Sequence, residues 1–194
     1  MLQERSEDHV KKLSIYCEDP ARIAHTSPLW SKPSIIRRHR PAIEYEEVTL
    51  LTRLLDARTS QNASYGFSIS LPLQPDTPTI IGTIGLDVTG ASGILRVMFG
   101  ATAVIVPPEV LPPGTFLALG VLLGTVFDQG SLVAYEVLPL GPGAQGVRIL
   151  SLNASHYNVP YPPSNELIYS LVLYSTIGGL RVGPESFYAT AYCD

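Results

Sequence analysis

The fold is indicated first by two apolar runs joined by a short turn, TFLALGVLLGTVF (115–127) and SLVAYEVL (131–138). Between them, Asp128-Gln129-Gly130 interrupts the apolar pattern with residues that favour a turn. Runs of this kind, rich in Leu and Val and bounded by Gly and Pro, are typical of β-strands. We therefore predict two strands joined by a tight turn here, within an all-β fold.

Further strand-like runs recur on both sides of this pair. The spacing predicts strands at 65–71, 79–88, 94–99, 101–106, 147–154, 165–177 and 180–192, the last two as a hairpin around Gly178-Gly179. The segment 44–57 fits either a helix or a first strand. Many short strands separated by turns are typical of a β-sandwich or barrel. We predict an antiparallel jelly-roll sandwich of about eight strands over residues 43–194.

Composition supports this fold class. The 194 residues include 17 Pro and 16 Gly, and only 15% are charged, against about 25% in ordinary soluble domains. Proline removes a backbone donor and interrupts helices, which argues against a helical bundle. No apolar stretch reaches the roughly 20 residues of a membrane span. The charged N-terminal sequence MLQERSEDHVKKLSIY lacks the apolar centre of a secretory signal.

Residues 1–42 show neither helical nor strand periodicity and are predicted to form an extended N-terminal arm or connector. Residues 1–40 carry eight Lys and Arg against five acids, whereas residues 41–194 carry five Arg against twelve acids. Opposite charges favour docking of such an arm on the body of a neighbouring subunit, by groove binding or strand addition. The apolar anchors expected for this docking are Ile15, Tyr16, Leu29, Trp30, Ile35 and Ile36.

The one basic cluster of the chain lies in this arm and contains Arg37, Arg38 and Arg40. Arginine clusters can hold phosphates, and viral coat proteins use basic arms in this way. A net arm charge of +3, from eight basic and five acidic residues, is weak for packaging a genome. We do not expect nucleic acid as a partner, and a charged hinge or a dock onto an acidic neighbour remains the alternative.

Residues for catalysis are sparse. His156 is the only histidine after residue 42, and we interpret it as an ordinary loop histidine. A nucleophile elbow of the G-x-S-x-G type and a glycine-rich phosphate loop are both missing from the sequence. The acids of the body stand mostly alone. The sequence therefore predicts no catalytic, cofactor-binding or metal-binding residue, no cofactor, and a protein that is not an enzyme.

The two cysteines, Cys17 and Cys193, lie near opposite ends of the chain. Two thiols form neither a four-ligand zinc site nor a disulfide framework. They are candidates for an intersubunit disulfide in an oxidising setting. The alternative is a pair of unpaired thiols.

Two segments resemble a known family. In TIIGTIGLDVTGASGILRVMF (79–99) and NELIYSLVLYSTIGGLRVGPESFYATAY (165–192), the most distinctive piece is Val-Gly-Pro-x-x-Phe at 182–187. They are similar to the tumour-necrosis-factor-like jelly-roll domains of Firmicute endospore surfaces, found in exosporium and spore-appendage proteins. The collagen-like stretch of the exosporium glycoproteins is missing from this sequence, and the appendage-type members resemble it better.

The resemblance implies a non-enzymatic structural protein that self-assembles as a trimer or a helical fibre. Its partners would be copies of itself and, as further candidates, other spore-surface proteins. It would be assembled in the mother cell and end on the spore surface, without a signal peptide or membrane. Two alternatives stay open: a viral jelly-roll capsid subunit with a basic arm, and a carbohydrate- or ligand-binding β-sandwich using the loop between Tyr157 and Tyr161.

Overall fold

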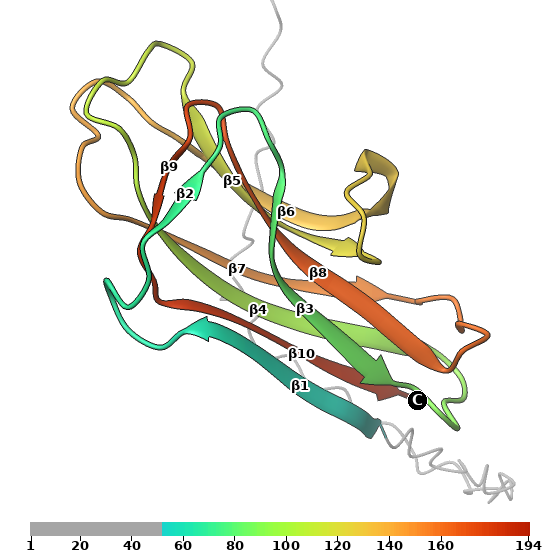
Figure 1. Ribbon diagram of the computed structural model, residues 1–194. Helices are drawn as coiled ribbons and strands as arrows, with labels where there is room; N and C mark the ends of the chain where they lie inside the picture. Colours follow the sequence, from blue (N-terminus) through green and yellow to red (C-terminus); the bar gives the residue numbers. More distant parts are fainter. Residues whose placement is uncertain (1–51) are drawn as a thin grey trace, which may run out of the picture. The chain divides into compact units, whose positions relative to one another are not determined.

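The computed structural model describes residues 52–194, which form an antiparallel β-sandwich (Figure 1). The arm and its boundary at residue 42 lie outside the described residues. The strands are β1 (Arg53–Ala63), β2 (Leu71–Leu73), β3 (Thr79–Asp87), β4 (Leu95–Val106), β5 (Phe116–Leu123), β6 (Leu132–Pro139), β7 (Arg148–Tyr157), β8 (Glu166–Ser175), β9 (Gly179–Arg181) and β10 (Glu185–Cys193), with one short 3₁₀ turn at Gln129–Ser131.

The strand order confirms the predicted jelly roll. One sheet has the order β1-β10-β4-β9-β2, with β7 paired to β4, and the other has the order β3-β8-β5-β6. We leave out the two three-residue strands, β2 and β9, and number the remaining eight strands 1 to 8 along the chain. The two sheets then have the strand orders 1-8-3-6 and 2-7-4-5. These are the two interleaved sheets of a jelly roll. The layers can be followed in Figure 1, with β7, β4, β10 and β1 in one sheet.

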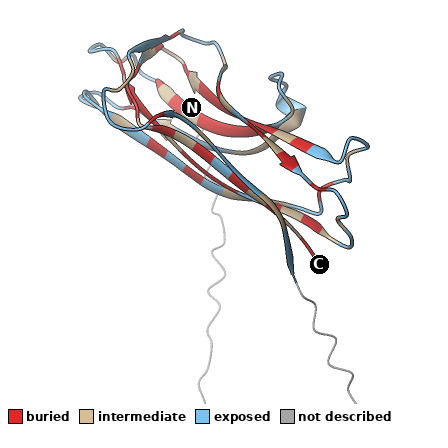
Figure 2. Ribbon diagram, turned by 60° about the horizontal axis from the view of Figure 1, so that its bottom comes forward, coloured by how far each residue is buried: buried red, intermediate tan, exposed pale blue. Residues whose placement is uncertain are grey.

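The core lies between the two sheets and is built by alternation along the strands. In β4, the side chains of Leu95, Val97 and Phe99 are buried, and Figure 2 shows buried and more exposed residues alternating along the strands. The Phe99 ring meets that of Tyr169 edge-on at 4.7 Å between centroids. Such pairs of buried rings add to the stability gained from apolar burial. The fold therefore rests on apolar layers contributed by both sheets.

The structure confirms most of the predicted strands and assigns the described end of the ambiguous segment, from Arg53 onward, to a strand. The runs 94–99 and 101–106 form one continuous strand, β4, in which Gly100 keeps its place in the ladder. The segment 44–57 is a strand from Arg53 onward. The rest of β1, RTSQNA (58–63), is mostly polar. An edge strand exposed on one side needs few apolar side chains.

Two local predictions are wrong. Residues 65–71 do not form a strand before Leu71, because a turn closes with a 3.2 Å bond from the Ser68 N–H to the Tyr65 carbonyl, and Phe67 has a φ of 59°. The expected hairpin around Gly178-Gly179 is a crossing between sheets. β8 pairs with β3 and β5, whereas β10 pairs with β1 and β4.

The Val-Gly-Pro-x-x-Phe motif has a structural role in this turn region. Residues 182–184 connect β9 to β10 through a cis Gly183-Pro184 bond. Across the turn, Arg181 donates to both carboxylate oxygens of Glu185, at 2.8 and 2.6 Å, and both side chains are buried. A Cβ at Gly183 would meet backbone and side chains at 2.8 Å, and its φ is +75°. The motif thus lies in a tight turn that the ion pair between Arg181 and Glu185 spans.

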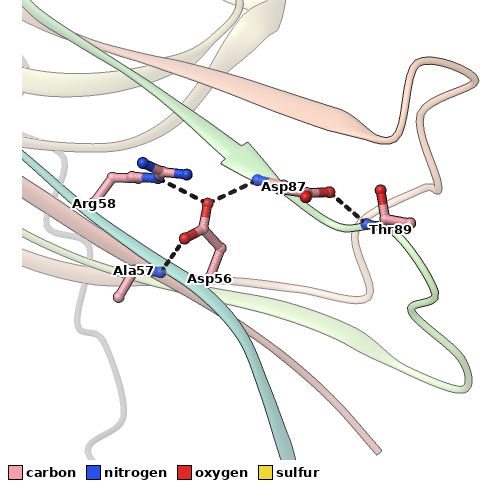
Figure 3. A network of polar contacts seen from close by, with 5 residues as sticks. All are labelled: Asp56, Ala57, Arg58, Asp87 and Thr89. Carbon is pink, nitrogen blue, oxygen red and sulfur yellow. Dashed lines mark hydrogen bonds and ion pairs between the residues drawn. The ribbon is translucent and has the colours of Figure 1, made fainter.

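A polar network joins the two sheets at one edge (Figure 3). The Asp56 carboxylate in β1 accepts 2.9 Å bonds from the Asp87 N–H at the end of β3 and from Arg58 Nε, and a 2.8 Å bond from the Ala57 N–H. Asp87 in turn accepts from the Thr89 N–H. The bond from Asp87, followed by that from Arg58, lowers the pKa of Asp56. The ionised form of Asp56 therefore links β1 to β3.

Candidate functional site

The outer side of the six-stranded sheet is the first candidate site. In adjacent strands, residues directly opposite each other point to the same side of the sheet. The pairing of β4 with β10 and β7 therefore gathers a row of outward side chains from four strands. We call this surface the neutral face; its members are Leu54, Ala57, Thr59, Gln61, Arg96, Met98, Gly100, Thr102, Ser151, Asn153, Ser155, Tyr157, Ser186, Tyr188, Thr190 and Tyr192.

The neutral face is almost without charge. Residues 52–194 contain five Arg and nine acids, of which Arg96 alone belongs to this surface. Its guanidinium is bonded to the Asp194 carboxylate and lies 5.6 Å from the centre of the Tyr157 ring. Depletion of charge together with Tyr and Met is typical of the buried centre of protein interfaces. The composition therefore suits a surface that another protein covers.

The neutral face is also hollowed. Met98 is 55% exposed and borders two shallow depressions, one of about 480 Å³ toward Tyr192 and Tyr157 and one of about 360 Å³ toward Tyr188. Tyr188 lies over Gly100, where a Cβ would collide with its ring. The missing side chain at Gly100 thus lets the tyrosine ring lie across the sheet. Depressions beside large side chains allow two copies of a surface to interlock.

A second candidate lies on the four-stranded sheet and its flanking loops. A concave region of about 700 Å³, here called the aromatic groove, is lined by side chains of β5, β6, β8 and the loops beside them. Phe116 and Tyr174 stack at 5.7 Å between ring centroids. Tyr174 donates a 2.9 Å bond to the Asp76 carboxylate at the rim. The remaining lining residues are Pro78, Ala118, Gly120, Phe127, Gln129, Leu132, Tyr135, Val137 and Val172.

His156 lies in β7, not in the loop that the sequence suggested. Its Nδ1 is 3.0 Å from the hydroxyl of Tyr169, which is fully buried. Burial lowers the pKa of His156 and raises that of Tyr169, so both groups are neutral near neutral pH. Within residues 52–194 this is the only hydrogen bond of the His156 ring. The pair satisfies a polar group inside the core.

The remaining predicted site residues divide between the two parts of the chain. Cys17, the apolar anchors and the arginines of the basic cluster all lie outside the described residues. Cys193 ends β10 with its side chain facing the core and 2% exposed. A disulfide from Cys193 to another subunit would therefore require the end of β10 to open. Among residues 52–194, no group of three or more His, Cys, Asp or Glu side chains is placed to hold a metal ion.

The two tyrosines of the suggested ligand loop take different positions. Tyr157 lies on the neutral face under Arg96, whereas the Tyr161 hydroxyl donates a 2.6 Å bond to the Gly93 carbonyl.

The sequence analysis predicted neither the neutral face nor the aromatic groove. The alternating uncharged residues of β10, from Ser186 to Tyr192, were the available signal for the neutral face. No helix in the described part of the chain is long and apolar enough to cross a membrane.

Comparison with known proteins leaves the family open. No protein-family model and no curated protein matches the chain. Among solved structures, dimeric latent PorU from Porphyromonas gingivalis is 15% identical, with a TM-score of 0.35, over 70% of this chain and 11% of that one. A Mud Crab Dicistrovirus chain is 13% identical, with a TM-score of 0.22, over 96% and 89%. Likenesses this loose carry no argument about function.

Proposed function

We propose that this chain is a non-enzymatic structural subunit that assembles with copies of itself through the neutral face. The observation that supports this most directly is the row of Tyr, Ser, Thr and Met side chains on four strands whose only ionic residue, Arg96, is neutralised by Asp194. The solvated face of a sheet ordinarily carries polar side chains, charged ones included, whereas charged side chains are depleted at the centre of interfaces. A second copy of the same surface is a suitable partner because neither side brings an unpaired charge.

In this proposal the arm of one subunit docks on the next subunit. Eight basic residues in positions 1–40 face a body with nine acids and five arginines over residues 52–194, and this opposite charge favours contact between copies. The setting that fits the sequence resemblance is a bacterial spore-surface layer or appendage fibre. A disulfide between Cys17 and Cys193 of two subunits would be a later cross-link, made only where the end of β10 opens.

Negative-stain electron microscopy of the purified full chain tests the proposal. Fibres or regular multi-subunit particles are expected. Dispersed particles the size of a single 21.0 kDa chain would refute self-assembly. Closed shells that also show the ultraviolet absorption of nucleic acid would favour the capsid alternative instead. Electrophoresis with and without reductant then checks the cross-link, since a Cys17→Ser variant should lose any covalent dimer.

A further inference from the structure

We propose that the aromatic groove is the docking site for residues 28–40 of the arm of a neighbouring copy, with Trp30 as the anchor. The inference deepens the proposed function and rests on it in taking the occupant from a second subunit. It assigns the arm to the four-stranded sheet and leaves the neutral face of the other sheet free for contacts between bodies.

The groove offers apolar surface that nothing in residues 52–194 covers. Phe127 is 39% exposed, Val137 is 45% exposed and Tyr135 is 66% exposed, all at its walls. The stacked pair Phe116 and Tyr174 forms a further part of the lining. A volume of about 700 Å³ lies within the ~300–1,000 Å³ of typical ligand sites. The groove is therefore large enough for a tryptophan with neighbouring aliphatic side chains.

The charges around the groove are negative. Asp76 lines it, and the exposed residue Asp128 directly follows the groove residue Phe127 in sequence. None of the arginines in the described part of the chain lines the groove. All five of these arginines have partners elsewhere. The ion pairs are Arg58 with Asp56, Arg96 with Asp194 and Arg181 with Glu185. Arg53 and Arg148 donate to backbone carbonyls. The rim can therefore accept a cationic peptide.

The sequence PLWSKPSIIRRHR (28–40) has the complementary chemistry. Trp30 and the adjacent pair Ile35-Ile36 supply apolar side chains, and the three arginines follow immediately. Pro28 and Pro33 each have a restricted φ and favour an extended conformation at the residue that precedes them. Proline-containing extended segments bind aromatic-lined grooves with a reduced loss of conformational entropy.

The reach of the chain is sufficient. Residues 41–51 separate this segment from the described body, and eleven extended residues span up to about 40 Å. A tether of this length can cross to an adjacent subunit. We assign the arm to a neighbouring copy because the proposed function is self-assembly, which places an adjacent body of opposite charge within reach of this tether.

Trp30 makes the docking measurable, since it is the only tryptophan of the 194 residues. Its emission maximum and its quenching by acrylamide should be recorded in the full-length protein, in Tyr135→Ser and in Val137→Ser. Tyr65→Ser is the matched control, because Tyr65 is 69% exposed and Tyr135 is 66% exposed, but Tyr65 does not line the groove. An Arg37→Gln, Arg38→Gln double variant tests the charge contribution.

We expect a blue-shifted, protected Trp30 in the native protein and a several-fold larger quenching constant in both groove variants. The control should match the native protein, and the arginine double variant should resemble the groove variants. Protection that increases with protein concentration assigns the occupant to a second copy. Protection in a monomer at all concentrations would overturn docking between copies.

Two further outcomes would overturn the groove assignment itself. Trp30 could be fully accessible in the native protein, or it could be protected and unaffected by both groove substitutions. Sedimentation velocity on the same samples separates this failure from failure of the proposed function. Large assemblies with an accessible Trp30 would refute arm docking in the groove and leave assembly through the neutral face intact.

Discussion

Replacing Tyr188 should weaken assembly without unfolding the body. Tyr188 is 49% exposed and lies over Gly100 on the neutral face. A buried tyrosine removes about 150–250 Å² from water, so covering the exposed half in an interface removes about 100 Å². At about 25 cal/mol per Å², this burial contributes about 2.5 kcal/mol per copy. Because both copies that meet carry the substitution, the loss is about 5 kcal/mol per contact, and we therefore expect Tyr188→Ser to raise the dissociation constant roughly 4,000-fold.

The assay is sedimentation velocity over a range of protein concentrations. Tyr188→Asp should have a larger effect than Tyr188→Ser, because it also places a charge in a surface that becomes buried. Tyr65→Ser is the control, since Tyr65 is exposed but lies in a loop outside the neutral face. Circular dichroism should show the same strand content in all variants. An unchanged assembly in folded Tyr188→Asp would refute the neutral face as the interface.

Three further predictions follow from the structure. Gly100→Ala should weaken assembly while the body stays folded, because the added Cβ collides with the ring of Tyr188; sedimentation identical to the native protein would contradict this. Glu185→Ala should lower the free energy of unfolding, measured by urea titration, by about 3–5 kcal/mol, since it leaves the buried Arg181 charge unpaired. An additional Arg181→Met substitution should recover much of this loss. If stability does not recover, the ion-pair explanation is contradicted. Burial lowers the pKa of His156 from its usual 6.5, so the unfolded chain takes up a proton first as pH falls. The free energy of unfolding should therefore be highest above about pH 6.5 and decline below it. His156→Phe should remove this part of the pH dependence, and equal slopes of stability against pH in both proteins would contradict the assignment.

The sequence was sufficient to predict the strands with buried side chains. β3, β5 and β8 read as apolar runs because one or both of their faces are buried. β1 was missed over most of its length, because RTSQNA is polar and only its pairing with β10 holds it in the sheet. Pairing between residues far apart in sequence is set by packing across the whole sandwich, and local propensity does not report it.

The same limit applies to the candidate sites. The uncharged alternation of β10 was visible in the sequence, but the face exists only where β10 and β7 both pair with β4 in register. The aromatic groove joins Asp76, Phe127 and Tyr174 from three separate segments. The expected Cys17–Cys193 pairing stays a prediction, and the buried position of Cys193 could not be predicted from its place next to the C-terminus.

The central claim, that copies of the chain meet through the neutral face, can be tested at Met98. This residue is 55% exposed in the single chain, and Met1 is the only other methionine of the sequence. The rate at which dilute peroxide converts Met98 to its sulfoxide should be measured by peptide mass spectrometry in the native protein and in Tyr188→Asp. We predict strong protection of Met98 in the native assembly and rapid oxidation in the variant. Equally rapid oxidation in both proteins would contradict the claim.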